Sequence, residues 1–512
     1  MKCKKSFPAL LALCCALLSC SDTDTEIPSQ VTAPVHLVQA FNLRAAENPD
    51  VLDADIIGEI SDTAIVLYSP TLLPHTHLVP EIRLAAGTDL QLNGLSYEFA
   101  SPVDFSEPLM LRVTAPDGSW QTLPVLFSQF TGLPVVYLNT EKHVPITSKT
   151  QYSSATISVH TGGNTSPAAW NMEEKPLQAR GRGYSTWMAP KKPYKLKFGK
   201  KTGLLDMPAA KTWALLANYL DRTKLRTSTA FYLGRLSNLE WMPGGRFVEL
   251  FVNGEHQGNY FLCELIKEGD NRLNIGKDAY VLEVDQATRL DADDVFSQTR
   301  RCLFNIKEPA VLYGSDGYEW IRNQVNLCED VLYGAFFLDP QKGYRKYIDL
   351  DSFVDWYLIN EITRNNDAVF WSSCYMHVAP GGKLKMGPLW DFDLAFGNYE
   401  ANNSYIPEGF WVRRAPWISR MWEDSVFVAA VRRRFDYFKE CLPLVYRHID
   451  REAELIRASV GADEKVWHTM NRSFGVTYYI WGNFDAEVSF VKRFLSERMQ
   501  WLDENIPTSV SF

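Results

Sequence analysis

A pair of aspartates two positions apart is the acidic motif with the clearest chemical meaning in this sequence. Asp391 and Asp393 lie in the segment Gly387-Pro-Leu-Trp-Asp-Phe-Asp-Leu-Ala-Phe-Gly. If this segment is extended, both carboxylates lie on one face, because side chains alternate along a strand. Two carboxylates that share a site repel each other, and a divalent cation such as Mg²⁺ relieves that repulsion. The motif predicts a metal site at Asp391 and Asp393; the alternative is a turn that caps the next helix.

A local excess of positive charge lies earlier in the chain. Nine basic residues and no acidic residue occur from Lys175 to Lys201, although the net charge of the whole chain is −9. The alternation in Tyr194-Lys-Leu-Lys-Phe predicts a strand with Lys195 and Lys197 on one face. The preceding Arg180-Gly-Arg-Gly loop would let backbone N–H groups approach an anion. We interpret the region as a phosphate or polyanion site; the alternative is a solvated strand face beside a glycine turn.

A second acidic segment, Asn360-Glu-Ile-Thr-Arg-Asn-Asn-Asp, follows a predicted helix. Glu361 and Asp367 are candidate acids, and Asp367 is also a candidate metal ligand or base. The alternative is a polar helix end followed by an Asn-Asn-Asp turn.

A third polar segment precedes another predicted helix. Asp221 is the expected N-cap of a helix that starts at Thr223. Arg222, Lys224 and Arg226 then lie near the helix start, where the macrodipole disfavours cations unless an anion binds. This placement gives weak support for a phosphate nearby.

The elements that must position these residues form two groups. Short strands with Gly, Pro and Asp turns over residues 36–131 predict a small all-β sandwich. Residues 132–508 predict one large α+β domain. Its expected elements include a hairpin at Asn253-Gly254, helices over 223–236 and 352–362, and a helical region from Pro416 that ends with a helix over 486–505.

Composition limits the class of protein. The 512 residues suggest two to four domains, and 46% hydrophobic with 22% charged residues is ordinary globular usage. These values exclude a disordered, collagenous or mostly membrane-embedded chain. The net negative charge does not suit a protein that coats nucleic acid, so we expect no nucleic-acid partner.

The first residues predict an exported lipoprotein. Three lysines precede a 12-residue apolar run that ends in Leu17-Leu-Ser-Cys20, which resembles a bacterial lipobox. We expect residues 1–19 to be a signal peptide, Cys20 to carry lipid, and residues 20–35 to form an acidic tether. The alternative is a plain secretory signal. The expected location is the outer membrane, at the cell surface or the periplasmic face.

Several ordered blocks over residues 134–400 resemble the CotH kinase family, the atypical protein kinases first known from spore coats. The blocks are Arg182-Gly-Tyr-Ser-Thr-Trp, Lys191-Lys-Pro-Tyr-Lys-Leu-Lys, Trp213-Ala-Leu-Leu-Ala-Asn-Tyr-Leu-Asp-Arg-Thr-Lys-Leu-Arg, Arg246-Phe-Val-Glu-Leu-Phe-Val-Asn-Gly-Glu-His-Gln-Gly-Asn-Tyr, Phe304-Asn-Ile-Lys-Glu-Pro and Trp390-Asp-Phe-Asp-Leu-Ala-Phe-Gly.

The resemblance implies a divergent protein-kinase-like domain that follows an immunoglobulin-like sandwich. It implies that the domain binds ATP with Mg²⁺ or Mn²⁺ and transfers the γ-phosphoryl group to Ser or Thr of a protein acceptor. Two positions depart from the family pattern: Tyr184 replaces a usual Asn, and Leu265 replaces a usual Lys.

The resemblance also assigns roles to individual residues. Asp391 would bind the metal with help from Asp393, and Asp367 would serve metal binding or catalysis. The expected nucleotide-binding residues are Arg182, Lys195, Lys197 and Glu264.

A non-catalytic function is the alternative. The chain would then be a surface or cell-wall interaction protein whose degenerate kinase fold binds a polyanion, a glycan or a protein partner. The expected location favours it, since little ATP is present outside the cell.

Overall fold

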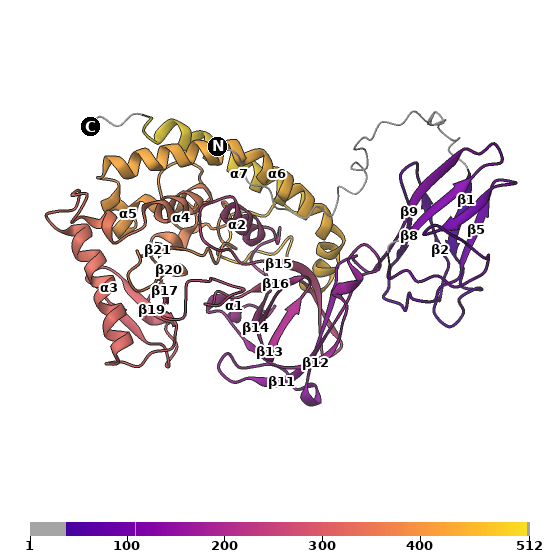
Figure 1. Cartoon of the computed structure of the whole chain (residues 1–512), viewed down its shortest axis with the longest axis horizontal. Coiled ribbons are helices and arrows are strands. Elements are labelled where there is room, and N and C mark those ends of the chain that lie inside the picture. Colours follow the sequence, from indigo (N-terminus) through magenta and orange to yellow (C-terminus); the bar gives the residue numbers. More distant parts are fainter. Residues whose placement is uncertain (1–36, 108, 509–512) are drawn as a thin grey trace, which may run out of the picture.

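The computed structural model describes residues 37–107 and 109–508. The predicted signal peptide, the lipidation site at Cys20 and the tether therefore lie outside the described residues. The described chain is a mixed α and β structure with a β-rich N-terminal region (Figure 1). No helix in this part of the chain is both long and apolar enough to cross a bilayer.

The N-terminal region consists of two sheets that share one hydrophobic core. The sheets have the strand orders β2-β1-β5 and β3-β4-β9-β8-β6-β7, and β4 pairs with β9 in parallel. Phe41, Leu67, Leu111 and Val125, from strands of both sheets, are fully buried in this core. The strands are β1 (Val38–Leu43), β2 (Ile56–Ile57), β3 (Glu59–Ile60), β4 (Ile65–Ser69), β5 (Pro80–Leu84), β6 (Asp89–Leu92), β7 (Leu95–Ser96), β8 (Leu109–Thr114) and β9 (Trp120–Gln129).

A closed barrel follows, with strand order β10-β11-β12-β13-β14-β16-β15. Its interior is apolar: alternate residues such as Leu196, Trp213 and Leu262 point inward and are fully buried. The residues between them point outward, which places Lys195 and Lys197 on the outer surface of the barrel. The strands are β10 (Val135–Thr140), β11 (Ser153–His160), β12 (Met172–Gly181), β13 (Tyr194–Leu204), β14 (Met207–Leu216), β15 (Gly245–Val252) and β16 (Glu255–Glu264).

A five-stranded sheet lies beside the barrel, with strand order β18-β19-β17-β20-β21. One face packs into the largest core through residues such as Leu282 and Phe304. The opposite face carries Glu283, Lys307 and Tyr375, which line a cleft. The strands are β17 (Tyr280–Asp285), β18 (Phe296–Gln298), β19 (Leu303–Glu308), β20 (Cys374–Val378) and β21 (Lys385–Met386).

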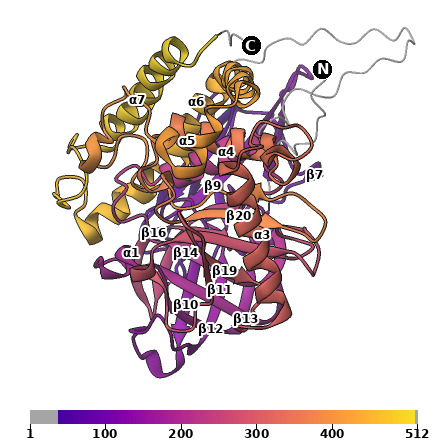
Figure 2. The same ribbon diagram turned by 90° about the vertical axis from the view of Figure 1, so that its left-hand side faces the viewer.

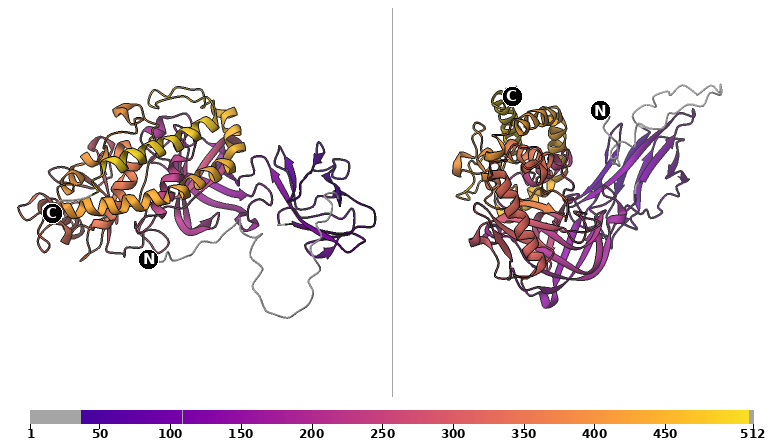
Figure 3. Two further views of the ribbon diagram at one scale, coloured as in Figure 1. Left: turned by 90° about the horizontal axis from the view of Figure 1, so that it is seen from above. Right: turned by 60° about the vertical axis from the view of Figure 1, so that its left-hand side comes forward.

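Helices cover the core side of this sheet. α3 lies beside this sheet (Figure 2). Its buried residues, including Ile321 and Val325, belong to the same core as the sheet. α6 and α7 lie side by side along one edge of the molecule (Figure 3). The helices are α1 (Ser185–Met188), α2 (Arg226–Arg235), α3 (Asp316–Tyr333), α4 (Leu350–Ile362), α5 (Pro416–Met421), α6 (Ser425–Trp467) and α7 (Phe484–Asn505).

Several predicted elements are confirmed with shifted ends. The Asn253-Gly254 hairpin is present, and both residues have the positive φ that a type I′ turn requires, 53° and 84°. α4 begins at Leu350, because the carboxylate of Asp349 accepts a hydrogen bond from the backbone N–H of Ser352. The predicted start of this helix at Ser352 is therefore two residues late. α3 was not predicted.

The N-terminal region and the barrel are joined by hydrogen bonds around one loop. The backbone N–H of Asn164 donates to the carbonyl of Phe127 at 3.0 Å, and the N–H of Phe127 donates to Asn164 Oδ1 at 2.7 Å. Gly163, which precedes Asn164, has φ +101°, and a Cβ there would lie 2.1 Å from the Phe127 carbonyl oxygen. Only glycine fits this joint without a shift. The boundary at residue 131 and the immunoglobulin-like identity stay predictions.

Candidate functional site

A cleft of about 310 Å³ lies between the barrel and the five-stranded sheet. The barrel side contributes basic residues, and the other side contributes most of the acidic ones. The charged residues that line it are Lys149, Arg180, Arg182, Lys191 and Lys195 on the barrel side, and Glu283, Asp285, Arg289, Asp291, Lys307, Asp391 and Asp393 on the other. The structure therefore places Arg182, Lys195, Asp391 and Asp393 at one cleft.

The glycine loop between β12 and β13 forms the lip of the cleft. A Cβ on Gly181 would lie 2.3 Å from the Trp187 ring, and one on Gly183 would lie 2.1 Å from Thr186 Oγ1. The backbone N–H of Gly181 donates to the carbonyl of Ser148 at 2.8 Å. The glycines thus allow the loop to pack on itself. The proposed free N–H at residue 181 is already used within the protein.

The two strand lysines lie in different surroundings. Lys195 lines the cleft, and no described carboxylate lies within ion-pair distance of it. Burial lowers its pKa to about 8, and the nearby charges of Lys267, Arg180 and Arg182 add to this effect. Lys197 is exposed, lies over the Tyr152 ring at 5.4 Å, and is not among the residues that line the cleft.

The surroundings of Asp391 and Asp393 raise the pKa of both carboxyl groups. Asp391 reaches solvent in the cleft, yet the cleft walls surround its carboxyl group and raise its pKa, and Asp367 raises it further. Ser373 Oγ donates a hydrogen bond to Asp391 Oδ2 at 3.2 Å. Burial raises the pKa of Asp393 well above its usual value, and the charges of Asp391 and Asp221 reinforce the shift. The carboxylates therefore destabilise one another.

The segment that carries both aspartates is neither extended nor a helix cap. Asp391 has φ +67°, in the left-handed region, and residues 393–398 form turns with no α-helix directly after them. The prediction that both carboxylates lie on one face of a strand is therefore wrong. A left-handed residue and a chain of turns bring the two side chains to the cleft instead.

Asp367 lies beside the cleft, without lining it. Its carboxylate is 3.6 Å from Arg289 Nη1 and accepts hydrogen bonds from Ser372 Oγ at 3.3 Å and Asn366 Nδ2 at 3.2 Å. Its side chain is 24% exposed. It is close enough to raise the pKa of Asp391 and Asp393.

Two predicted acids have structural partners elsewhere. Glu264 pairs with Arg272 and accepts a hydrogen bond from the N–H of Gly244 at 2.7 Å; it does not line the cleft. Glu361 is fully buried against Arg498 at 2.5 Å. These partners account for both carboxylates, which a single sequence does not reveal.

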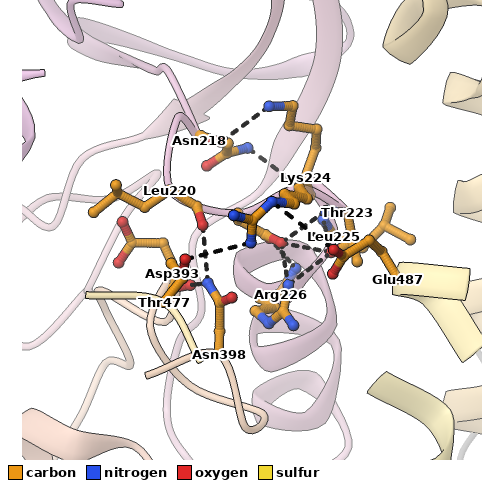
Figure 4. Close-up of polar contacts among 12 residues, drawn as sticks. Asn218, Leu220, Thr223, Lys224, Leu225, Arg226, Asp393, Asn398, Thr477 and Glu487 are labelled. Carbon is orange, nitrogen blue, oxygen red and sulfur yellow. Dashed lines mark hydrogen bonds and ion pairs between the residues drawn. The ribbon is translucent and has the colours of Figure 1, made fainter. Parts of the chain in front are cut away.

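The basic residues at and just before the start of α2 also bind within the protein (Figure 4). Arg222 is fully buried and donates to backbone carbonyls, including that of Thr469 at 3.1 Å. Lys224 lies 3.2 Å from Asp463, and Arg226 pairs with Asp221. Asp221 accepts hydrogen bonds from the N–H groups of Thr223 at 3.0 Å and Arg226 at 2.9 Å. However, α2 begins at Arg226 with Leu225 at its cap position, so the predicted N-cap at Asp221 of a helix starting at Thr223 is wrong. The suggestion that this cluster holds a phosphate is therefore wrong.

Sequence reasoning missed an acidic pair on β17. Glu283 and Asp285 both line the cleft, and Glu283 lies 3.5 Å from Lys307. Burial raises the pKa of Glu283 to about 7. The pair has the same two-residue spacing as Asp391 and Asp393, within an apolar strand, and this spacing was an available signal.

The protein supplies some of the ligands that a divalent cation would need in the cleft. Among the described residues, no group of three or more His, Cys, Asp or Glu side chains is arranged to hold a metal. Asp391 and Asp393 nevertheless repel each other, and Arg182 and Arg289 offset only part of the rise in the pKa of Asp391. Mg²⁺ commonly binds through one or two carboxylates and completes its shell with phosphate oxygens and water. This pair suits that mode of binding.

Comparisons with known proteins identify the family. A family model described as CotH kinase protein matches residues 178–502. No curated protein matches the chain. A solved structure from Bacteroides thetaiotaomicron, described as a "putative glycoside hydrolase", aligns with 59% of this chain and 89% of its own at 13% identity, with a TM-score of 0.16. That score supports no conclusion about fold or function. Because the family match spans more than half of the chain and includes every cleft aspartate described above, the chain belongs to the CotH kinase family.

Proposed function

We propose that this protein binds ATP with Mg²⁺ in the cleft and transfers the γ-phosphoryl group to a Ser or Thr hydroxyl of a protein acceptor. One observation carries the proposal: among the described residues, Lys195, Arg180 and Arg182 line the cleft without an ion-pair partner, and mutually repelling carboxylates lie around Asp391. A metal–triphosphate unit carries both kinds of charge and relieves both clusters at once. Family membership agrees with it. We also propose that this domain has a divergent protein-kinase-like fold.

Each cleft residue has a role in this proposal. Lys195 and Arg182 hold phosphate oxygens, and Asp391 with Asp393 holds Mg²⁺. When bound, Mg²⁺ would neutralise charge between the carboxylates and the phosphates. Lys197 and Glu264, which the structure places away from the cleft lining, are left without a role in nucleotide binding.

The transfer step needs positioning and charge balance. The acceptor hydroxyl oxygen forms a bond to the γ-phosphorus while the bond from that phosphorus to the β–γ bridging oxygen breaks. ADP leaves with the electron pair, and the hydroxyl proton passes to a carboxylate. Asp367 is our candidate for that proton, because it lies beside Asp391 and its side chain is partly exposed.

The experiment that tests the function combines binding and chemistry. The full-length chain is incubated with labelled ATP and Mg²⁺ or Mn²⁺, and a mixture of envelope proteins is supplied as acceptor. The proposal expects a metal-dependent rise in Tm with nucleotide, and label on protein Ser or Thr. If neither is seen with either metal, the proposal is wrong.

A non-catalytic function is the second candidate, and one observation favours it. Arg289 and Ser372 engage the carboxylate of Asp367, which does not line the cleft. In this case the cleft binds a polyanion, glycan or protein partner of the cell envelope. Binding of such a ligand with no label transfer would support this candidate.

We further propose that lipid on Cys20 anchors the protein in the outer membrane, facing the cell surface or the periplasm. Release of the chain from membranes by Cys20→Ser would support it.

A further inference from the structure

Arg289 is a cleft residue that neither the sequence motifs nor the proposed function uses. It ends the short helix η3 (Ala287–Arg289), directly after β17. Its guanidinium lies 3.6 Å from Asp367 Oδ2 and also donates to Ser372 Oγ. Ser372 Oγ in turn donates to Asp367. Arg289 thus holds together the two ends of the loop from Asp367 to Ser372.

Arg289 lines the same wall of the cleft as Asp285 and Asp391. Arg289 donates to Ser372 Oγ, and the neighbouring Ser373 donates to Asp391 Oδ2 at 3.2 Å, so the guanidinium lies close to the Asp391 carboxylate. Lys307, the other cation that lines this wall, lies 3.5 Å from Glu283 and 3.7 Å from Asp294, at the far end of β17 and β19. Among the described residues, Arg289 is therefore the cation of this wall beside Asp367 and Asp391, while Arg182 faces Asp391 from the barrel side.

Arg289 also reaches the opposite lip of the cleft. Its guanidinium lies over the ring of Tyr184 at 5.7 Å, and Lys149 approaches the same ring at 5.7 Å. Tyr184 is 56% exposed, so the ring is held by these cations and not by core packing. Arg289 therefore connects the carboxylate wall to the glycine loop.

We propose that Arg289 is a positioning residue of the transfer site: it holds Asp367 in place and, through its charge, limits the affinity of the Asp391–Asp393 pair for a divalent cation. This inference rests on the proposed function. An arginine near two carboxylates competes electrostatically with a metal for the same negative charge, since both stabilise the ionised form. At the same time the arginine orients Asp367 toward the site where a proton is to be received.

The inference predicts that metal binding and phosphoryl transfer change in opposite directions when Arg289 loses its charge. Loss of the positive charge should strengthen metal binding and weaken transfer, whereas loss of a merely structural residue would weaken both. Arg289→Met keeps much of the side-chain volume and removes the charge. Arg289→Lys keeps the charge and loses the planar fork that contacts Asp367 and Ser372.

The test measures Mn²⁺ binding to the full-length chain by electron paramagnetic resonance, without nucleotide. Arg289→Met should bind Mn²⁺ about three- to tenfold more tightly, and Arg289→Lys should bind it as the unchanged chain does. In the transfer assay Arg289→Met should lower kcat with little change in the KM for ATP, and Arg289→Lys should restore part of the rate. Arg322→Met is the matched control, because Arg322 pairs with Glu319 on the exposed face of α3.

Unchanged or weaker Mn²⁺ binding in a folded Arg289→Met variant would overturn the inference. Circular dichroism and Tm establish that the variant is folded, and a misfolded Arg289→Met is replaced by Arg289→Gln, with the same expectation for Mn²⁺. If the unchanged chain binds no Mn²⁺ either alone or with a non-hydrolysable ATP analogue, the metal site of the proposed function fails, and the inference fails with it. If the inference alone is wrong, the unchanged chain still binds Mn²⁺, and Arg289→Met does not bind it more tightly.

Discussion

Lys195 on β13 and Asp391 after β21 line one cleft from opposite sides, although they lie far apart in the sequence. Each is unfavourable in its charged form for a similar reason. Burial and neighbouring cations lower the pKa of Lys195 to about 8, while burial and Asp367 raise the pKa of Asp391. A ligand that presents negative phosphate to one and a metal to the other stabilises both charged forms.

Asp391→Asn tests the metal site with the least disturbance of the backbone. Asp391 has φ +67°, a conformation that Asn adopts more readily than Ala does. The variant should keep its Tm in the absence of ligand. It should lose the Mg²⁺-dependent part of nucleotide affinity, by more than about tenfold, since it removes a negative metal ligand. Calorimetric titration of ATP with and without Mg²⁺ measures the effect.

Asp485→Asn is the matched control for this change. The side chain of Asp485, on α7, is 71% exposed and pairs with Arg457 on α6. It should leave nucleotide affinity unchanged. Equal Mg²⁺-dependent affinity in Asp391→Asn and the unchanged chain would show that Asp391 does not bind the metal.

The lowered pKa of Lys195 predicts how anion binding depends on pH. Lys195 is charged below about pH 8, so affinity for inorganic triphosphate should fall as pH rises through 8. The stability of the unliganded chain should change in the opposite sense. Because the unfolded state holds the lysine proton up to its usual pKa of 10.5, the contribution of Lys195 to the free energy of unfolding rises from pH 8 to 10.5.

Lys195→Arg separates this effect from other titrations, because arginine stays charged over the whole range. In Lys195→Arg the decline in triphosphate affinity above pH 8 should disappear. A decline of the same size in both proteins would assign it to another group.

Local signals in the sequence predict elements better than they predict charge partners. Asn253-Gly254 specifies its hairpin because both positive φ values suit these residues. The helix ending at Ile362 is predicted to the residue at its end, and its start is displaced by two residues because Asp349 supplies the cap. α3 carried available signals, since Ser315 caps it and its apolar residues recur at helical spacing.

The site is predicted in part for the same reason. Lys195 and Asp391 stand out by local charge pattern, and the structure places both at one cleft. No local pattern shows the ion pairs of Glu264 with Arg272, of Glu361 with Arg498 and of Asp367 with Arg289. Those partners come from elements distant in the sequence, so tertiary packing alone decides which carboxylates stay available.

The Glu361–Arg498 pair predicts a large effect on stability. Both side chains are fully buried 2.5 Å apart, and Glu361 also accepts a hydrogen bond from the N–H of Trp411 at 2.6 Å. Arg498→Met leaves a buried carboxylate without its cation, which costs about 3–5 kcal/mol in the free energy of unfolding. Urea unfolding measures it.

The exposed pair of Arg322 and Glu319 supplies the comparison, at 46% and 39% side-chain exposure. Arg322→Met should change the free energy of unfolding by less than about 1 kcal/mol. Similar values for Arg322→Met and Arg498→Met would contradict the structural role assigned to Glu361.

Gly163→Ala tests whether the N-terminal region and the barrel act as one unit. The added methyl group would lie 2.1 Å from the Phe127 carbonyl oxygen and would force apart the backbone pairing of Asn164 with Phe127. The free energy that holds the N-terminal region against the barrel should fall by about 1–3 kcal/mol, while both cores remain intact. Calorimetry should then resolve two unfolding transitions where the unchanged chain shows closely coupled ones, and limited proteolysis should cut within residues 128–134.

Gly118→Ala separates the effect of the clash from that of backbone strain. Gly118 has a similar positive φ of 84°, yet a Cβ there meets nothing within 4 Å. This variant should destabilise the N-terminal region slightly and leave the joint closed to protease. Cleavage at residues 128–134 in both variants would mean that strain alone opens the joint. Cleavage in neither variant would mean that the pairing at Asn164 does not hold the two parts together, because the bonds of Gln129 to Gly162 and of Thr131 to Glu249 then suffice.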